Sequence, residues 1–205
     1  HDVAPLVTKP ASPTPLVYGR CAACGHGQRL SGPSVDHVYE SAKYYEQRSA
    51  DGTGYAAYAA ERQDREAKGT RLLDWLATHL GSGPRSLLEV GSGFGYTLAA
   101  AAKRGWPTLG VDVNPEAARA ARATYGFETL TSTLPQALES GQIAEADWGV
   151  VLYGFVLEHL ESPAAELSAA RRVLAPGGCL ALVVPNMQTF ELDVFGASYR
   201  SLRSD

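Results

Sequence analysis

The sequence predicts an α/β fold in which a parallel β-sheet is covered by helices on both faces. Strand-like and helix-like segments alternate through residues 86–184, and parallel strands need crossover connections that are usually helical. A glycine-rich turn joins the first of these strands to a helix, and an acidic residue ends the second strand. Ligands of such sheets bind at the carboxyl ends of the strands, so the same observations indicate a binding site there.

The expected elements follow from local patterns. A helix is expected over Ala56–Leu80, where Leu72, Leu76 and Leu80 form one apolar face. The predicted strands are Ser86–Val90, Pro107–Asp112, Glu128–Leu130, Trp148–Tyr153 and Cys179–Val184. The predicted helices between them lie near Tyr96–Arg104, Pro115–Tyr125, Leu134–Glu139 and Ala164–Leu174. Asn114 is expected to cap the second of these helices, with Pro115 in its first turn.

The glycine turn has the pattern E-x-G-x-G-x-G, formed by Glu89, Gly91, Gly93 and Gly95. Such a turn lets the backbone approach a ligand closely and directs the N–H groups of a helix N-terminus at it. A dinucleotide-binding turn, G-x-G-x-x-G, would have its last glycine at the position of Tyr96. The turn therefore lacks the pyrophosphate-binding signature.

Asp112 ends the second predicted strand and follows the glycine turn at about the distance, roughly 20 residues, that the nucleotide-binding pattern expects. A carboxylate in that place can bind both hydroxyls of a ribose. The turn and the acid together indicate a nucleoside-containing cofactor.

These residues, with three later motifs, resemble the class I S-adenosylmethionine-dependent methyltransferases over about Ser86–Asn186. The later motifs are an apolar strand after an acid (Asp147–Tyr153), the V-L-E-H-L segment (Val156–Leu160) and the L-x-P-G-G turn (Leu174–Gly178). The resemblance implies a Rossmann-like sheet that binds S-adenosylmethionine and transfers its methyl group in line to a small-molecule acceptor. The class I sheet has seven strands, so the fold is expected to lack its C-terminal strands in this chain.

The resemblance also implies roles for individual residues. The glycine turn would lie against the methionine part of the cofactor and Asp112 would hold the ribose. The segment Val38–Tyr58 would help to cover the cofactor; the alternative is that its tyrosines only pack an appendage onto the domain. The cofactor-binding candidates are Glu89, Gly91, Gly93, Gly95, Asp112, Thr133, Leu134 and Tyr153, of which Thr133 and Leu134 would contact the adenine.

His159 is the candidate catalytic base, because an imidazole has a pKa near neutrality. The alternative, which we favour at this point, is that Glu158 and His159 shape a short helix beside the site. Some ubiquinone-pathway O-methyltransferases place a metal on E-x-x-E-H in this segment. Here Phe155 occupies the first position, so no catalytic metal is expected. Phe155 either contacts cofactor or substrate or packs in the core.

The N-terminal region is expected to form two segments, a flexible lead-in over residues 1–17, which holds four prolines, and a partial zinc-knuckle-like segment over residues 18–55. Cys21 and Cys24 form a C-x-x-C-G turn typical of half a structural zinc site, and His26 is a candidate third ligand. A closed site needs four ligands, so a remnant knuckle with free thiols is the alternative. Residues 56–205 form the expected cofactor-binding methyltransferase domain, incomplete at its C-terminus. Methyltransferases of the resembled type often carry an N-terminal zinc ribbon.

Composition limits the classes of function. The 205 residues have a net charge of −4 and no basic block that would indicate a nucleic-acid partner, and no apolar run long enough to span a membrane. Three cysteines and no visible signal peptide make the cytoplasm the default location. A nicotinamide-dependent oxidoreductase and a non-catalytic module that retains the cofactor fold remain as alternatives to a methyltransferase.

Overall fold

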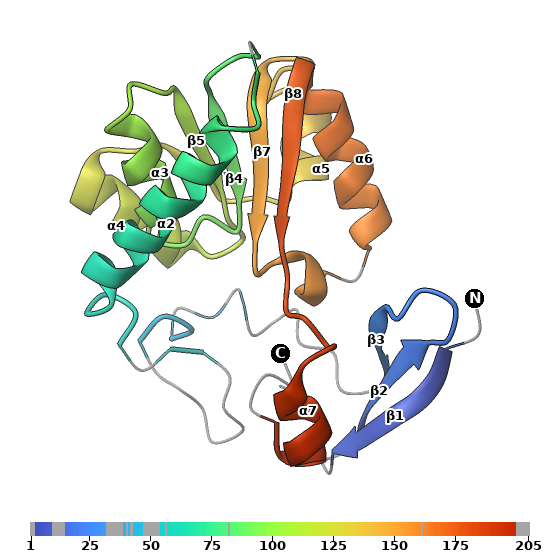
Figure 1. Cartoon of the computed structure of the whole chain (residues 1–205). Helices are drawn as coiled ribbons and strands as arrows, with labels where there is room; N and C mark the ends of the chain where they lie inside the picture. Colours follow the sequence, from blue (N-terminus) through green and yellow to red (C-terminus); the bar gives the residue numbers. More distant parts are fainter. Residues whose placement is uncertain are drawn as a thin grey trace.

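The protein is built around a five-stranded parallel sheet, which the computed structural model shows with helices on both faces (Figure 1). The structure describes residues 3–9, 15–31, 39, 41, 43–46, 54–55, 57–81, 83–160 and 162–199. The strands are β4 (Leu87–Val90), β5 (Thr108–Val111), β6 (Thr129–Leu130), β7 (Trp148–Gly154) and β8 (Leu174–Val183), in the order β6-β5-β4-β7-β8. All neighbouring pairs are parallel, so the predicted α/β class is confirmed.

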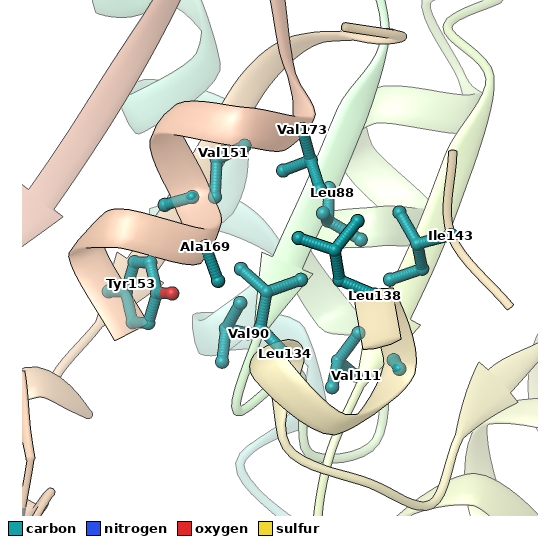
Figure 2. Packing of buried hydrophobic residues seen from close by; sticks show 12 residues of the cluster. Leu88, Val90, Val111, Leu134, Leu138, Ile143, Val151, Tyr153, Ala169 and Val173 are labelled. Carbon is teal, nitrogen blue, oxygen red and sulfur yellow. The ribbon is translucent and has the colours of Figure 1, made fainter. Parts of the chain in front are cut away.

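In the described part of the chain, one group of helices covers one face of the sheet and a second group covers the other (Figure 1). The first group is α2 (Arg62–Ala77), α3 (Tyr96–Ala102) and α4 (Pro115–Tyr125); the second is α5 (Leu134–Glu139) and α6 (Pro163–Val173). Each face buries its own apolar cluster. Figure 2 shows the cluster between the sheet and α5 and α6, in which Leu88, Val111 and Val151 are fully buried. The strands are apolar on both faces because both faces are covered.

Side-chain caps fix where two of these helices begin. The Asn114 side chain accepts a hydrogen bond from the Glu116 N–H, and Pro115 occupies the first turn of α4. Thr133 caps α5 and forms a reciprocal capping box with Gln136. Both caps satisfy backbone donors that a helix start leaves unpaired. The loops that follow β5 and β6 are therefore held at the carboxyl edge of the sheet.

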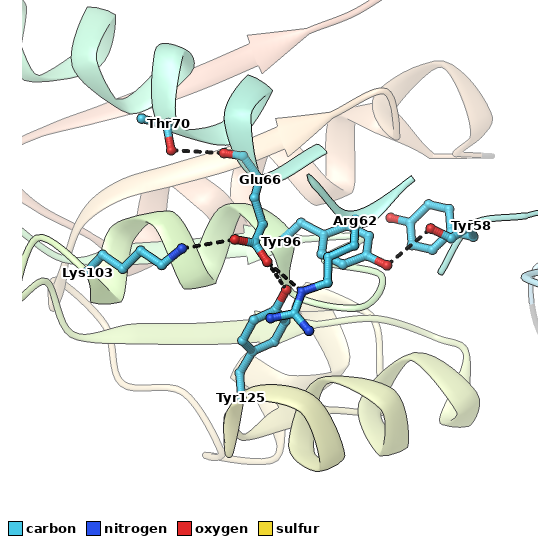
Figure 3. Close-up of polar contacts among 7 residues, drawn as sticks. All are labelled: Tyr58, Arg62, Glu66, Thr70, Tyr96, Lys103 and Tyr125. Atoms are coloured by element: carbon cyan, nitrogen blue, oxygen red, sulfur yellow. Dashed lines mark hydrogen bonds and ion pairs between the residues drawn. The ribbon is translucent and has the colours of Figure 1, made fainter. Parts of the chain in front are cut away.

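Glu66 connects α2 to its two neighbours (Figure 3). Its carboxylate accepts hydrogen bonds from Tyr125 of α4 at 2.6 Å, from Arg62 at 2.7 Å and from Lys103, just after α3, at 2.9 Å. Arg62 also lies over the Tyr125 ring, 4.8 Å from its centroid. These polar contacts connect α2 to the C-terminal ends of α3 and α4.

The C-terminal part of the described chain differs in detail from the prediction. β8 begins at Leu174 rather than Cys179, because Leu174 pairs with Trp148 before an irregularity that contains Gly177 at φ 76°. After β8 a short helix, α7 (Phe190–Phe195), begins at Thr189, whose hydroxyl accepts from the Leu192 N–H. The sequence analysis did not predict α7.

A second, antiparallel sheet precedes the main one. Its strands are β1 (Val3–Lys9), β2 (Leu16–Cys21) and β3 (Gly27–Ser31), in the order β1-β2-β3. The expectation of a flexible lead-in is therefore wrong for residues 3–9 and 16–17; residues 1–2 and 10–14 of that segment lie outside the described residues. Pro5 is accommodated because β1 is an edge strand with a register shift just after it.

The small sheet lies next to the chain that leaves β8 (Figure 1). Arg20 of β2 donates a 2.7 Å hydrogen bond to the Met187 carbonyl. A side chain at Gly27 would collide with Met187, and one at Gly25 would collide with Gln188. These close contacts place the small sheet at the carboxyl end of β8, on the edge of the main sheet where ligands of such folds bind.

Candidate active site

The glycine turn after β4 requires glycine for two separate reasons. Gly91, Gly93 and Gly95 have φ values of 68°, 52° and 79°, in the left-handed region that favours glycine. In addition, a side chain at Gly91 would collide with Val156, which follows β7. The turn also pairs with β5, since the Gly91 N–H donates to the Val111 carbonyl at 2.7 Å. The spacing read from the sequence therefore corresponds to a tight turn at the carboxyl edge.

Asp112 lies directly beside this turn and is almost fully buried. Its Oδ2 accepts hydrogen bonds from the Gly93 N–H at 2.8 Å and the Tyr45 hydroxyl at 3.3 Å. Its Oδ1 accepts from the Asn114 N–H at 2.8 Å. Burial raises the pKa of Asp112, and these three hydrogen bonds oppose that rise. The acid and the glycine turn thus form one hydrogen-bonded unit.

Glu89, inside β4, is the other buried acid near the turn. Burial raises its pKa to about 8, opposed by hydrogen bonds from the Thr97 hydroxyl and the Leu98 N–H; the charge of Asp112 adds to the rise. Its Oε2 is buried without a hydrogen-bond partner. A buried carboxyl oxygen without a partner is costly, so Glu89 is poised to accept a hydrogen bond from a donor or, once ionised, to bind a cationic group.

Aromatic side chains cover the turn. Tyr45 and Tyr58 are buried with Tyr96, and Phe94 packs against them. The Tyr58 hydroxyl lies 2.5 Å from the place a Gly93 side chain would occupy. The sequence analysis placed Val38–Tyr58 over the cofactor or at an interface of the appendage, and Tyr45 and Tyr58 do lie on the turn. Residues 38, 40, 42, 47–53 and 56 lie outside the described part.

The three remaining cofactor candidates have other partners. Thr133 caps α5. Leu134 and Tyr153 are fully buried members of the apolar cluster beneath the sheet (Figure 2). The Tyr153 hydroxyl donates to Glu166 of α6 at 3.0 Å. The side chains of Leu134 and Tyr153 thus belong to the core, and contact of these two side chains with a cofactor has no support in this arrangement.

His159 ends a single 3₁₀ turn, Leu157–His159, after β7. Its Nε2 lies 3.8 Å from a Glu158 carboxylate oxygen, and its ring lies 5.3 Å from the Tyr39 ring. With 22% of the side chain exposed, the imidazole is accessible. Phe155, before this turn, is 59% exposed and has a φ of 58°, so the core-packing alternative for Phe155 is wrong.

The cysteine turn has the geometry of a half-site. The pKa of Cys21 is lowered, mainly by the N–H groups of Cys24 and Ala23, and the two thiols are free. Within the described ranges no three His, Cys, Asp or Glu side chains are grouped to hold a metal ion. Four ligands close a structural zinc site, so the described residues do not fit zinc, and the zinc expectation has no support from them.

Sequence reasoning missed several contacts at this site. Asn114 was predicted as a helix cap, yet its amide also donates to the carbonyls of Tyr39 and Ser41. The hydrogen bond from Tyr45 to Asp112 was not predicted either. Both contacts join segments far apart in the chain, and no local spacing indicates them.

Comparisons with known proteins agree with this geometry. Residues 88–180 match the family described as a methyltransferase domain. A ubiquinone biosynthesis O-methyltransferase from Pseudomonas paraeruginosa is 29% identical over 157 residues, which cover 71% of this chain and 67% of that protein. A solved SAM-dependent methyltransferase from Archaeoglobus fulgidus has a TM-score of 0.55 at 22% identity, over 68% of this chain and 63% of that one. A sugar N-methyltransferase from a Streptoalloteichus species has a TM-score of 0.54 at 20% identity, over 65% of this chain and 54% of that one.

The parallel sheet with a glycine turn after β4 and an acid after β5 defines the class I methyltransferase fold. The family match lies on the same segment, from β4 into β8. The family match and the curated relative identify a methyltransferase domain over residues 88–180, and the solved structures share the fold of SAM-dependent methyltransferases. No helix in the described ranges combines the length and the apolar character that crossing a membrane requires.

Proposed function

We propose that the protein transfers the methyl group of S-adenosylmethionine to a small-molecule acceptor, and that the cofactor binds at the glycine turn and Asp112. One observation carries this proposal. The turn, Asp112 and the unpartnered carboxylate oxygen of Glu89 meet at the carboxyl ends of β4 and β5, where open parallel sheets bind their ligands.

The residues present fit this cofactor chemically. Asp112 would hold the ribose hydroxyls, and the backbone of the glycine turn, which carries no side chain at Gly91, Gly93 or Gly95, would lie against the methionine part. Glu89 offers a buried carboxyl oxygen without a partner, and a cationic group bound beside it would lower its raised pKa and favour the ionised form. Of the remaining candidates, Thr133 would contact the adenine, because it lies in the loop after β6, where its side chain caps α5.

The cofactor, when bound, supplies a methyl group made electrophilic by a sulfonium. The protein must then align the acceptor and exclude water, and such positioning can lower a barrier by roughly 7–11 kcal/mol. We propose His159 as the base that takes the proton from an acceptor hydroxyl at its imidazole nitrogen. Its exposure and its place after β7 support this role.

The small-molecule acceptor is supported by the relatives. The curated relative from Pseudomonas is named for O-methylation in ubiquinone biosynthesis, and an oxygen acceptor is consistent with a nearby imidazole base. The sugar N-methyltransferase shares the fold alone. We therefore favour a hydroxyl group of a small molecule as the acceptor.

Calorimetric titration with S-adenosylhomocysteine tests the cofactor assignment, with NADH titrated in parallel. We expect binding of S-adenosylhomocysteine that Asp112→Ala abolishes and that Asp147→Ala, an exposed acid at the opposite end of β7, leaves unchanged. Binding of NADH alone would overturn the proposal. Equal effects of the two substitutions would show that Asp112 has no special role.

A further inference from the structure

The aromatic side chains over the glycine turn form a single packed cap. We use the name aromatic cap for Tyr45, Tyr55, Tyr58, Phe94 and Tyr96. The Tyr45 and Tyr58 rings lie 4.8 Å apart, and each lies 4.9 Å from the Phe94 ring. Such edge-to-face and tilted contacts stabilise aromatic clusters. The cap therefore presents a fixed apolar surface, with two hydroxyls directed at the site.

The first hydroxyl, that of Tyr45, supplies the second hydrogen bond to Asp112 Oδ2. That oxygen accepts from the Gly93 N–H at 2.8 Å and from Tyr45 at 3.3 Å, which uses both of its lone pairs. Oδ1 accepts from the Asn114 N–H and retains one lone pair. A ribose whose two hydroxyls donate one to each carboxylate oxygen needs an open acceptor position on both oxygens. The carboxylate offers only one such position while Tyr45 is bound.

The second hydroxyl covers the glycine turn itself. The Tyr58 Oη lies 2.5 Å from the position of a Cβ on Gly93, so it occupies the close-approach space that the glycine leaves open. Tyr58 is held firmly: Arg65 lies 4.1 Å from its ring centroid, and the Tyr96 hydroxyl donates to its carbonyl at 3.1 Å (Figure 3).

We propose that the Tyr45 hydroxyl occupies the position on Asp112 that a ribose hydroxyl of the cofactor takes, so that cofactor and tyrosine compete for this carboxylate. The proposal rests on the proposed function, because it names the cofactor's ribose as the competing group. A residue that only covers the bound cofactor would strengthen cofactor binding. The Tyr45 hydroxyl is instead expected to weaken it.

Within the aromatic cap, Tyr45 is the residue whose hydrogen bond to Asp112 the cofactor can displace. Its hydrogen bond, at 3.3 Å, is longer than the usual 2.5–3.0 Å for O–H···O. The Gly93 and Asn114 donors are backbone groups at 2.8 Å, and they cannot leave without unfolding the turn. Exchange of one hydroxyl for another on Asp112 keeps the buried carboxylate satisfied.

The test is titration of the full chain with S-adenosylhomocysteine, comparing wild type, Tyr45→Phe and Tyr55→Phe. Tyr55→Phe is the matched control, because Tyr55 belongs to the same cap but makes no contact with Asp112 in the described hydrogen bonds. We expect Tyr45→Phe to tighten binding about threefold to tenfold, the range that loss of one competing hydrogen bond allows. The control should match wild type.

Each other outcome is decisive. Weaker binding by Tyr45→Phe would show that the hydroxyl contacts the bound cofactor, and unchanged binding would show that it does not compete; either result overturns the inference and leaves the proposed function standing. Absence of binding by all three folded proteins would instead overturn the proposed function and the inference with it. Thermal unfolding of each protein without ligand verifies that the substitutions leave the fold intact.

Discussion

Tyr153 of β7 and Glu166 of α6 form a buried polar pair inside the main apolar cluster. The hydroxyl donates to the carboxylate at 3.0 Å and lies 3.3 Å from the Glu166 carbonyl. Burial raises the pKa of Glu166, and the Tyr153 hydrogen bond opposes that rise. The pair joins the central sheet to the helix that covers it and accounts for a tyrosine in an otherwise apolar strand.

Tyr153→Phe should destabilise the protein without affecting the cofactor. Loss of the hydroxyl leaves the Glu166 carboxylate without this donor and should cost about 1–3 kcal/mol of unfolding free energy, measured by urea denaturation. The affinity for S-adenosylhomocysteine should stay at the wild-type value, because the ring is in the core. A large loss of affinity at normal stability would instead support the cofactor contact suggested by the sequence.

Glu89 should make stability depend on pH. Its pKa is raised to about 8 in the fold, so between about pH 4.5 and 8 the folded protein holds a proton that the unfolded chain has released. Stability from this group is present below about pH 4.5 and is lost as pH rises through about 8, by at most about 1.4 kcal/mol per pH unit. Glu89→Gln should remove this slope in thermal unfolding series and weaken binding of S-adenosylhomocysteine. An unchanged slope would contradict the assignment.

Gly91→Ala should cost more than the strain of its backbone. Gly91 and Gly141 have φ values of 68° and 74°, yet a side chain at Gly141 meets nothing within 4 Å, whereas one at Gly91 collides with Val156. Gly141→Ala should therefore lose about 1 kcal/mol from conformation alone. Gly91→Ala should lose more and should also lose S-adenosylhomocysteine binding. Equal losses in denaturant titrations would show that the Val156 contact is unimportant.

Glu66 and its partners should make the folded protein less stable at acid pH, the opposite of the effect of Glu89. The hydrogen bonds from Tyr125, Arg62 and Lys103 lower the pKa of Glu66 to about 2. Stability from this group is present above about pH 4.5 and is lost as pH falls through about 2. Glu66→Gln should lower the free energy of unfolding by about 1 kcal/mol at pH 7. The difference from wild type should disappear near pH 2, and a constant difference would contradict the charge-based explanation.

Local patterns predicted most of the main sheet and part of the site. The apolar runs predicted all five strands, and all but β8, which begins at Leu174 rather than Cys179, lie close to their predicted bounds, because strands buried on both faces are continuous apolar runs. Glycine spacing located the turn, because a positive φ restricts residue choice at each position. The Asn114-Pro115 pair marked the start of α4 for the same kind of local reason.

The features that were not predicted depend on contacts between distant residues. Val3–Lys9 forms a strand because it pairs with Leu16–Cys21, although the prolines of this segment disfavour a strand. Tyr153 ends in the core because α6 brings Glu166 to its hydroxyl. Tyr45 reaches Asp112 from 67 positions away. Each result depends on which surfaces meet in space, and residue spacing along the chain carries no information about that.

The contact between Arg20 and Met187 joins positions 167 residues apart. Closing so long a loop has an entropic cost that no local contact offsets. The small sheet is therefore expected to form this contact after the main sheet has positioned the chain that follows β8. We therefore expect its docking to be a late event in folding. Hydrogen exchange should then show β1–β3 opening independently of β4 and β7.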